Sequence, residues 1–343
     1  MIVDFANKKN SKIAQTEPTQ KRAIRRQAKK KDVQPKPAPK EQTEYKASLL
    51  FYLDRFIREN TNVYRKETIK RYQTLHVLIK GYQEHSKTVF TFESVNIDWG
   101  NRFIDFLINV RNNQNEATHK VKVCLFKFLR YYSERGFIFN QSIFKLTVKQ
   151  LNKLDFPIIT ESELTKLIET KVPPILEKYK DLFLFQLFTG QRISDVKAFR
   201  KEQVKGLIWD FYAEKTSKLT KVPLSGFGAY ALVILKKYDY KLPAFTEQHL
   251  NKNIKEICRI AGIDEPFTFQ RLQGARVITT TKPKWELITT HTARRSCISL
   301  LISKGIPLPT IMKLTGHSDV RMLMKYEQNQ FDALEKAFQN IKL

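Results

Sequence analysis

The sequence predicts a mainly α-helical protein with two folded parts, a four-helix bundle followed by an α+β body that contains a small β-hairpin sheet. Three observations predict this fold class. Apolar residues recur at helical spacing between residues 43 and 140. Strand-like patterns appear only further on, near residues 207–224 and at 275–281. A chain of 343 residues is also too long for one small core.

Residues 1–42 form a basic first segment. Residues 1–40 contain twelve Lys or Arg against three acids, and three prolines follow the basic run. The lack of apolar periodicity is typical of a segment that is disordered when free. It is either a solvated linker without a partner or an arm that contacts phosphates. The residues available for such contacts are Lys21, Arg22, Arg25, Arg26, Lys29, Lys30 and Lys31.

Residues 43–140 are expected to form the four-helix bundle. Stripes at helical spacing are core residues whatever the bundle does, so they say nothing about function. Only basic residues that point outward are candidates for phosphate contact. These candidates are Lys120, Lys122 and Lys127. The clearest stripe consists of Val121, Cys124, Leu125, Phe128, Leu129 and Tyr132.

Residues 141–159 are expected to link the bundle to the second body, which spans 160–330. Thr160 and Glu163 have the spacing of a capping box, which predicts the start of a helix. The Lys- and Thr-rich segment near 207–224 predicts a β-hairpin.

Two more helices are expected near the C-terminus. Apolar residues at helical spacing predict a helix over Thr292–Ser303. Another helix is expected within 331–343, with Phe331, Leu334, Phe338 and Ile341 on one side. This last helix either covers its own domain or docks on a neighbouring subunit.

The charge of the chain indicates a polyanionic partner. Lys and Arg outnumber Asp and Glu by 61 to 34, a formal net charge of +27, and residues 1–40 supply only +9 of it. The folded part is therefore basic too. The three cysteines have neither metal-ligand nor disulfide spacing. The sequence shows no apolar leader and no run of 18 apolar residues, so a cytoplasmic protein without a membrane span is the expectation.

Six polar residues of the second body could together cleave a phosphodiester without a metal. Attack by an alcohol builds negative charge on the non-bridging oxygens, and fixed cationic donors lower that barrier. Arginine can donate two hydrogen bonds to two phosphate oxygens, and histidine or lysine can move protons. Tyrosine can form a covalent intermediate. The six residues are Arg192, Lys215, His291, Arg294, His317 and Tyr326.

The spacing of these residues supports a shared site. His291 and Arg294 stand three apart on the expected helix, so both side chains project from one face, and Arg295 is nearly as well placed.

The ordered set resembles the tyrosine recombinase (phage integrase) family. Thr160–Leu164 is similar to the start of the family's catalytic domain, and Thr189–Asp195 to its first arginine motif. Three later segments are similar to its C-terminal pattern: His291–Arg295, Ile311–Ser318 and Lys325–Tyr326. The bundle resembles the family's core-binding domain, which grips DNA from the face opposite the catalytic domain.

The resemblance implies a role for each residue. Tyr326 would attack the scissile phosphate and keep the 3′ end as a phosphotyrosine. Lys215 would protonate the departing 5′ hydroxyl, although Lys218 or Lys221 could occupy the same turn. His291 would assist in proton handling. The phosphate oxygens would be held by Arg192, Arg294 and His317.

One residue departs from the family pattern. Gln191 stands where the family usually has an apolar residue, and we expect a local packing change only.

The function implied is site-specific DNA recombination without metal or nucleotide cofactor, in the integration and excision of a mobile element. A chromosome-dimer resolvase of the same family is the nearest alternative, although such resolvases usually lack a long basic extension. A DNA-binding regulator on this scaffold would have at least one broken catalytic position, and none is broken here. A basic architectural protein would make the ordered set a coincidence.

The family also implies partners. They are double-stranded DNA, three further copies of the chain in a homo-tetramer linked by exchange of the C-terminal helix, and DNA-bending accessory proteins. Such a protein would be associated with the nucleoid. The target DNA sequence does not follow from residue spacing, because specificity depends on which side chains reach base edges and on DNA deformability.

Overall fold

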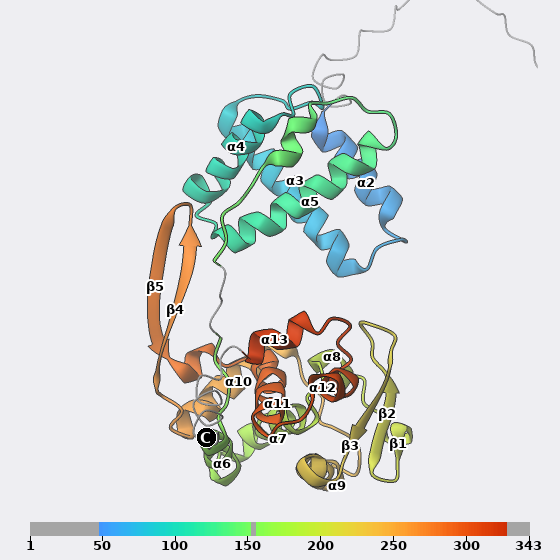
Figure 1. The fold of residues 1–343 in the computed structure, drawn as a ribbon, viewed down its shortest axis with the longest axis vertical. Coiled ribbons are helices and arrows are strands. Elements are labelled where there is room, and N and C mark those ends of the chain that lie inside the picture. The colour runs from blue at the N-terminus through green and yellow to red at the C-terminus, as the bar shows by residue number, and fades with distance from the viewer. Residues whose placement is uncertain (1–47, 152–155, 328–343) are drawn as a thin grey trace, which may run out of the picture.

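The computed structural model describes residues 48–151 and 156–327, which form two bodies (Figure 1). The N-terminal body is a bundle of four helices, as the apolar spacing predicted. The last turn of its third helix widens into a π-helix at Phe106–Val110, and a 3₁₀-helix, Gln141–Lys145, follows the bundle. The four helices are α2 (Leu49–Asn60), α3 (Lys66–Ser86), α4 (Ile97–Asp105) and α5 (Asn115–Ser133).

Aromatic rings fill the interior of the bundle. Trp99 and Phe103 of α4 stack on each other with ring centroids 5.4 Å apart, and Phe56 of α2 meets Phe128 of α5 edge to face at 5.9 Å. All four side chains are buried. Aromatic pairs in these geometries add stability beyond the area that they bury, so the bundle has a core of its own.

The C-terminal body is mixed, with helices predominating. The Thr160 hydroxyl accepts a hydrogen bond from the Glu163 amide at 3.3 Å, and the Glu163 carboxylate accepts one from the Thr160 amide at 2.8 Å. The predicted capping box is therefore confirmed. The helices are α6 (Glu161–Glu169), α7 (Pro174–Thr189), α8 (Ile193–Lys197), α9 (Ala229–Lys237), α10 (Glu247–Ile260), α11 (Thr290–Ser303), α12 (Leu308–Thr315) and α13 (Arg321–Glu327).

Helix α7 lies at the centre of this body. Residues 181–189 are all buried, and the helix packs against α9, α10 and α11. The second half of α7 is thus buried on every side and belongs to the interior of the body. The end of α7 therefore gives a fixed platform for the residues that follow it.

A three-stranded antiparallel sheet covers one side of the C-terminal body. Strand β2 (Ile208–Tyr212) pairs with both β1 (Val204–Lys205) and β3 (Leu219–Pro223). The β2–β3 pair is the hairpin predicted near 207–224. Trp209 and Val222 stand opposite each other in the register and are buried, so the inner face of the hairpin belongs to the core.

A second hairpin was only half predicted. The β-branched stretch at 275–281 belongs to β5 (Arg276–Pro283), and its partner β4 (Pro266–Gln273) escaped detection. Most side chains of both strands are exposed or half-buried, and the apolar alternation of β4 is short. Half-buried Phe267 and Phe269 alternate with exposed residues, but Arg271 and Leu272 break the pattern. A short 3₁₀-helix, η5 (Lys284–Leu287), connects β5 to the segment before α11.

This second hairpin bridges the two bodies (Figure 1). Its turn meets the N-terminal end of α5, where the buried Asn115 side chain accepts a hydrogen bond from the Gly274 amide at 2.7 Å. The same side chain donates to the Gly274 carbonyl and to the Lys149 carbonyl, both at 2.9 Å. Asn115 thus joins the bundle, the hairpin and the connecting segment.

A weaker contact also joins the bodies. The Arg65 guanidinium donates to the Glu214 carbonyl in the β2–β3 turn at 3.4 Å.

Two sequence expectations lie outside the described residues, namely the basic segment 1–42 and the helix expected at 331–341. Within the described ranges, no helix is both long enough and apolar enough to span a bilayer.

Candidate active site

Arg294 lies at the centre of the candidate site. Its helix, α11, starts at Thr290, two residues earlier than predicted, because the Thr289 and Thr292 side chains form a reciprocal cap. The Arg294 side chain is 1% exposed. Its Nη1 donates to the Gly190 carbonyl at 3.0 Å and its Nη2 to the Thr315 carbonyl at 2.7 Å. Burial lowers the pKa of Arg294 to about 10, which leaves it charged at neutral pH.

His317 lies against this guanidinium. Its Nε2 is 3.1 Å from Arg294 Nη2, and its Nδ1 is 2.7 Å from the Thr315 hydroxyl, which itself donates to the Ile311 carbonyl at 2.6 Å. Since the arginine can only donate, the network assigns the proton to Nδ1. Burial, followed by the fields of Arg294 and Arg192, lowers the pKa of His317 to about 3. The imidazole is therefore neutral at neutral pH.

Two glycines direct the chain into the site. Gly190 ends α7 with φ +66° and Gly316 ends α12 with φ +65°, a left-handed conformation that costs glycine least. A Cβ on Gly190 would lie 2.8 Å from the Cys297 sulfur. The two helix ends therefore deliver Arg192 and His317 to neighbouring positions, since a Cβ on Gly316 would lie 3.8 Å from Arg192 Nη1.

Gln191 fixes the segment that bears Arg192. Its buried side-chain amide donates to the Thr189 carbonyl and to the Leu314 carbonyl, each at 2.8 Å. The departure from the family pattern is thus a polar link between the end of α7 and α12, and not only a packing change. It ties the Arg192 segment to the helix end that precedes His317.

Arg192 has free hydrogen-bonding capacity. Its Nη1 is buried and has no hydrogen-bond partner among the described residues, and the same holds for the Thr216 hydroxyl in the β2–β3 turn. Both atoms lie within about 4 Å of the position that a Cβ on Gly316 would take. Two unpaired polar groups beside a second buried arginine form a suitable place for an anion.

Lys215 lies in the β2–β3 turn and is exposed. The turn is anchored to α8, because the buried Asp195 carboxylate accepts a hydrogen bond from the Glu214 amide at 2.9 Å. The charge of Lys215 acts on His291. Lys221 instead lines an apolar pocket of about 350 Å³ between β3 and α12.

His291 stands among cations at the start of α11. Surrounding protein atoms, and then the charges of Arg295, Arg294, Arg192 and Lys215, lower its pKa to about 4. Part of the ring is exposed, so water screens this field more than it does at His317. His291 is thus a neutral base held next to positive charge, and it retains access to solvent.

Tyr326 lies on α13, which packs against α11. The ring is 9% exposed and belongs to an apolar cluster with Ile298, Ile311 and Leu323. Tyr326 is close enough to Arg294 to act on the pKa of its guanidinium. The geometry therefore brings the residues singled out in the sequence around Arg294. They come from the residue before α8, the β2–β3 turn, α11, the segment after α12, and α13.

Comparison with known proteins gives the family of the chain. The model of the phage integrase family matches residues 157–333, which is more than half of the chain. The chain belongs to the phage integrase family. The family that the sequence resembled is therefore confirmed, and the protein is a tyrosine-type site-specific recombinase.

The relatives of this recombinase agree with that assignment. A probable integrase/recombinase of Acholeplasma phage L2 is 25% identical over 276 residues, which cover 77% of this chain and 88% of the phage protein.

Solved structures with the same fold include a lambda integrase tetramer bound to a Holliday junction, with a TM-score of 0.63, 13% identity and coverage of 84% of this chain and 80% of lambda integrase. The Tn1549 transposon integrase in complex with a circular intermediate DNA has a TM-score of 0.63 and 14% identity. The match covers 86% of this chain and 100% of the transposon integrase chain. The mainly helical fold class is confirmed.

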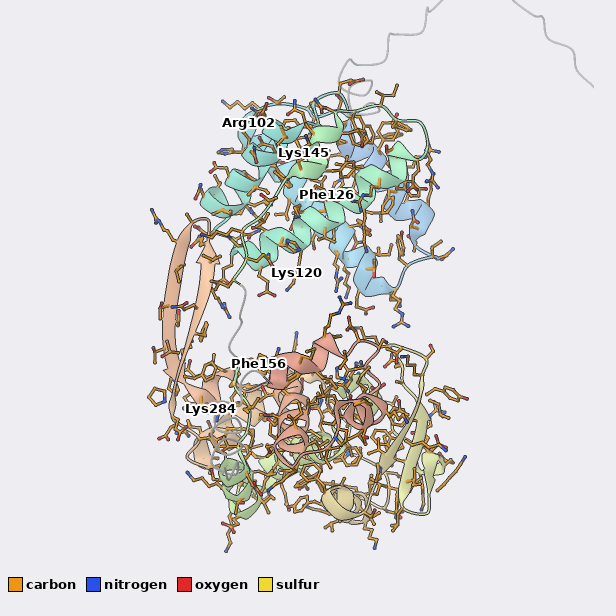
Figure 2. All side chains as sticks on the ribbon, in the orientation of Figure 1. Arg102, Lys120, Phe126, Lys145, Phe156 and Lys284 are labelled. Carbon is orange, nitrogen blue, oxygen red and sulfur yellow. The ribbon has the colours of Figure 1, made fainter. Side chains whose placement is uncertain are left out.

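The three basic candidates of the bundle differ in their exposure to solvent. Lys120 is exposed on the side of the bundle that faces the C-terminal body (Figure 2), with its ammonium 2.7 Å from Glu116. Lys127 is exposed as well. Lys122 does not point outward as expected, because it is half-buried, lies over the Phe126 ring and donates to the Leu146 carbonyl. The seven candidates of the N-terminal segment, from Lys21 to Lys31, lie outside the described residues.

Sequence reasoning missed several residues that build the site. Thr315 orients His317, Asp195 anchors the turn of Lys215, and Thr216 offers a hydroxyl beside Arg192. Each is a small polar residue within three positions of a residue that was singled out, so proximity in the sequence was a usable signal. The contact of Asp195 with Glu214 joins residues 19 positions apart and could not be read from spacing.

Proposed function

We propose that this recombinase integrates and excises a mobile DNA element by cutting and rejoining strands through a phosphotyrosine at Tyr326. The observation that supports this best is the gathering of like charges around Arg294. Burial is the largest cause of the lowered pKa of Arg294, and the charge of Arg192 lowers it further. Burial also lowers the pKa of His291 most, followed by the charges of Arg295, Arg294, Arg192 and Lys215. Like charges held together destabilise the free protein, and a bound phosphodiester would relieve that repulsion.

The proposed chemistry assigns one task to each group. The Tyr326 oxygen forms a bond to phosphorus as it loses its proton, and the bond from phosphorus to the 5′ oxygen breaks. Lys215 gives a proton to that leaving oxygen, and His291 accepts the phenolic proton. Arg192 and Arg294 bind the non-bridging oxygens, where charge increases in the transition state. His317 joins them once its proton lies on Nε2, because that nitrogen can then donate to a phosphate oxygen. Rejoining is the same sequence in reverse.

The low pKa of His291 suits its task as proton acceptor. An imidazole with a pKa of about 4 is unprotonated at neutral pH and can accept a proton, although a low pKa also makes it a weak base. The approach of the phosphodiester adds negative charge, which raises the proton affinity of His291 at the moment it is needed.

A trap for the covalent intermediate tests the proposal. On a duplex nicked close to the cut site, the released 5′ end diffuses away and religation stops. The wild-type protein should accumulate a protein–DNA adduct, and Tyr326→Phe should give none. Tyr212→Phe is the matched control, because Tyr212 is an exposed phenol on β2 of the same body. Adduct formation by Tyr326→Phe would overturn the proposed nucleophile.

We further propose that the protein acts on double-stranded DNA as a homo-tetramer. Support comes from the lambda integrase structure, a tetramer on a Holliday junction. The linking element would be the C-terminal segment, where Phe331, Leu334, Phe338 and Ile341 share one helical face in the sequence. A chain cut after Gln330 should bind DNA but fail to assemble, as measured by the mass of the DNA complex in light scattering. Tetramers formed by that shortened chain would count against helix exchange.

The basic segment is proposed to contact DNA backbone phosphates. Its candidates are Lys21, Arg22, Arg25, Arg26, Lys29, Lys30 and Lys31. Each neutralised phosphate adds about 0.9 to the slope of log affinity against log salt. Deletion of residues 1–40 should therefore flatten that slope, and an unchanged slope would remove this role. The nucleoid as location and DNA-bending accessory proteins are predictions of the same proposal.

A further inference from the structure

The ring of Tyr326 is contacted by a residue of the segment that connects the two bodies. The Phe156 ring, labelled in Figure 2, lies 5.2 Å from the Tyr326 ring between centroids, at an interplanar angle of 66°. Phe156 is half-buried and joins the apolar cluster around Tyr326, whose other members are supplied by α11, α12 and α13. A residue far from Tyr326 in the sequence thus packs against its ring.

Arg295 holds Phe156 from another direction. The guanidinium carbon lies 4.3 Å from the centroid of the Phe156 ring, a cation–π geometry. Its Nε is buried and has no hydrogen-bond partner among the described residues. No hydrogen bond of Nε therefore draws the guanidinium away from the ring. Arg295 follows Arg294 directly on α11. The same helix turn therefore bears the central arginine of the site and the residue that clamps Phe156.

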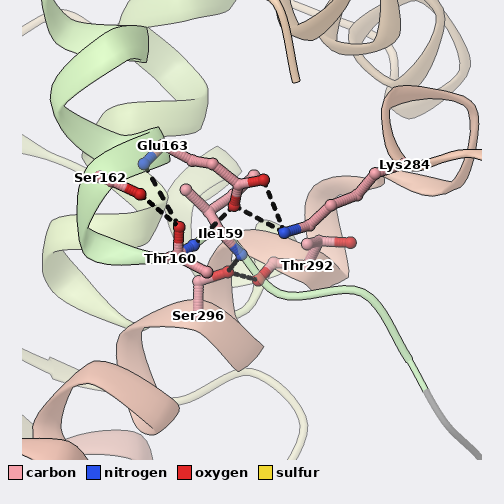
Figure 3. A network of polar contacts seen from close by, with 7 residues as sticks. All are labelled: Ile159, Thr160, Ser162, Glu163, Lys284, Thr292 and Ser296. Carbon is pink, nitrogen blue, oxygen red and sulfur yellow. Dashed lines mark hydrogen bonds and ion pairs between the residues drawn. The ribbon is translucent and has the colours of Figure 1, made fainter. Parts of the chain in front are cut away.

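The connecting segment is fixed to α11 just after Phe156. The Ile159 amide donates to the Ser296 hydroxyl at 2.7 Å, and Ser296 donates to the Thr292 carbonyl (Figure 3). The next residue, Thr160, caps α6 together with Glu163, and Glu163 forms a buried ion pair with Lys284 at 2.6 Å. These bonds anchor the chain three residues after Phe156.

We propose that Phe156 is a positioning residue for Tyr326 and that Arg295 holds Phe156 in that place. The proposal rests on the proposed function of Tyr326 as the nucleophile. Phe156 acts through Tyr326, and Arg295 acts on Tyr326 through Phe156 in addition to lowering the pKa of His291. Since Phe156 belongs to the connection between the bodies, the position of the nucleophile depends on the path of that connection.

The rate of adduct formation on nicked DNA measures positioning. At saturating DNA, Phe156→Ala should react about 10- to 100-fold more slowly, since a misplacement of about 1 Å can slow a reaction 100-fold. Phe156→Leu, which keeps apolar volume without a ring, should fall between Phe156→Ala and wild type. Phe156→Tyr keeps the ring and should restore the rate to within about threefold. DNA affinity should be unchanged in all three.

Phe126→Ala is the matched control. Phe126 is also half-buried, meets a second ring edge to face at 5.2 Å, and lies 5.4 Å from the ammonium of Lys122, but in the other body. Its removal should leave the rate at saturating DNA unchanged. Arg295→Met should slow the reaction in the same direction as Phe156→Ala, and Arg295→Lys should preserve more of the rate. A normal or faster rate in Phe156→Ala would overturn the proposal.

A second measurement is independent of DNA chemistry. Acetylation of tyrosines by N-acetylimidazole, mapped by mass spectrometry in the full-length DNA-free protein, should be faster at Tyr326 in Phe156→Ala than in wild type or Phe126→Ala. An unchanged acetylation rate would overturn the positioning role. If wild-type protein formed no Tyr326-dependent adduct, the proposed function would fail, and the acetylation rates would still decide whether Phe156 positions the ring.

Discussion

The two bodies of this recombinase differ in what they bury. Among the described residues, the buried polar side chains of the N-terminal bundle are neutral, and they are Ser48, Asn60, Asn115 and Thr118. The C-terminal body buries charged and titratable groups, among them Glu163, Asp181, Asp195, Lys284, Arg294 and His317. The bundle can therefore interact electrostatically with DNA only through its surface. The C-terminal body holds charge at low solvent exposure, where electrostatic interactions are strong enough to affect chemistry.

The difference between the two bodies predicts a large loss of stability when the buried ion pair of Glu163 and Lys284 is broken. Lys284→Met leaves the Glu163 carboxylate buried without its partner, which should cost about 3 to 5 kcal/mol of unfolding free energy in urea titrations. Lys304→Met is the matched control. Lys304 forms an exposed ion pair with Glu161, which lies on α6 like Glu163, and the two side chains are 60% and 68% exposed. That control should cost roughly 1 kcal/mol or less. Equal losses in the two variants would show that burial does not distinguish the pairs.

The two arginines should separate catalysis from stability. Arg192→Ala and Arg294→Ala should each slow adduct formation about 100- to 1,000-fold, because each removes a charged donor from the transition state. Arg294→Ala should also destabilise the fold, since the Gly190 and Thr315 carbonyls lose their partner. Arg192→Ala should leave stability nearly unchanged, because its Nη1 is unpaired. Normal rates in both variants would refute the assignment of the phosphate ligands.

The buried histidine predicts how stability depends on pH. The pKa of His317 is about 3 in the folded protein, below the value near ~6.5 of an unfolded histidine, so the unfolded chain binds more protons between these values. The contribution of His317 to stability is thus intact above pH ~6.5 and is lost as the pH falls toward 3. His317→Gln should flatten the urea midpoint against pH between pH ~7 and ~5. A wild-type slope in that variant would assign the pH dependence to other groups.

The contact between the bodies should have a moderate effect. Asn115→Ala removes the hydrogen bonds to Gly274 and Lys149, each worth about 1 kcal/mol. Amide hydrogen exchange at the β4–β5 turn should speed up, while exchange in the core of α7 should not. Unchanged protection at Gly274 would mean that the hairpin turn is held by other contacts.

The smallest effect is expected at the bundle surface. If Lys120 contacts a phosphate, Lys120→Ala should weaken binding of all DNA sequences alike and reduce the salt slope by about 1. Arg102→Ala is the control, because Arg102 is an exposed cation on the side of the bundle away from the C-terminal body (Figure 2). An equal loss in both variants would point to a general charge effect without a defined contact.

Much of the fold was predictable because helices are encoded locally. The Thr160–Glu163 cap and the apolar stripe of α5 are set by residues three or four positions apart. The β4–β5 hairpin was only half predictable, since few of its side chains are buried and the apolar alternation of β4 is too short to reveal a strand. Lys122 was misplaced because spacing alone does not show that a neighbouring segment covers one side of a helix.

The candidate site shows the same division. The residue types and their order pointed to Arg192, His291, Arg294, His317 and Tyr326, and their grouping around Arg294 agrees with that prediction. The choice of Lys215 over Lys218 and Lys221 stays a prediction. The link from Gln191 to Leu314 and the ring contact of Phe156 with Tyr326 could not be predicted, because they join residues 123 and 170 positions apart.

The sequence by itself determined the helical stripes and caps, the basic charge, the chemistry available and the family. These depend on residue types and on neighbours along the chain, which any conformation of the chain retains. Only the tertiary structure decided that Arg294 is buried, that His317 is neutral, that a hairpin turn meets Asn115 and that Phe156 contacts Tyr326. Burial and long-range contacts exist only once distant segments are packed together, and these change pKa values and hold side chains in place.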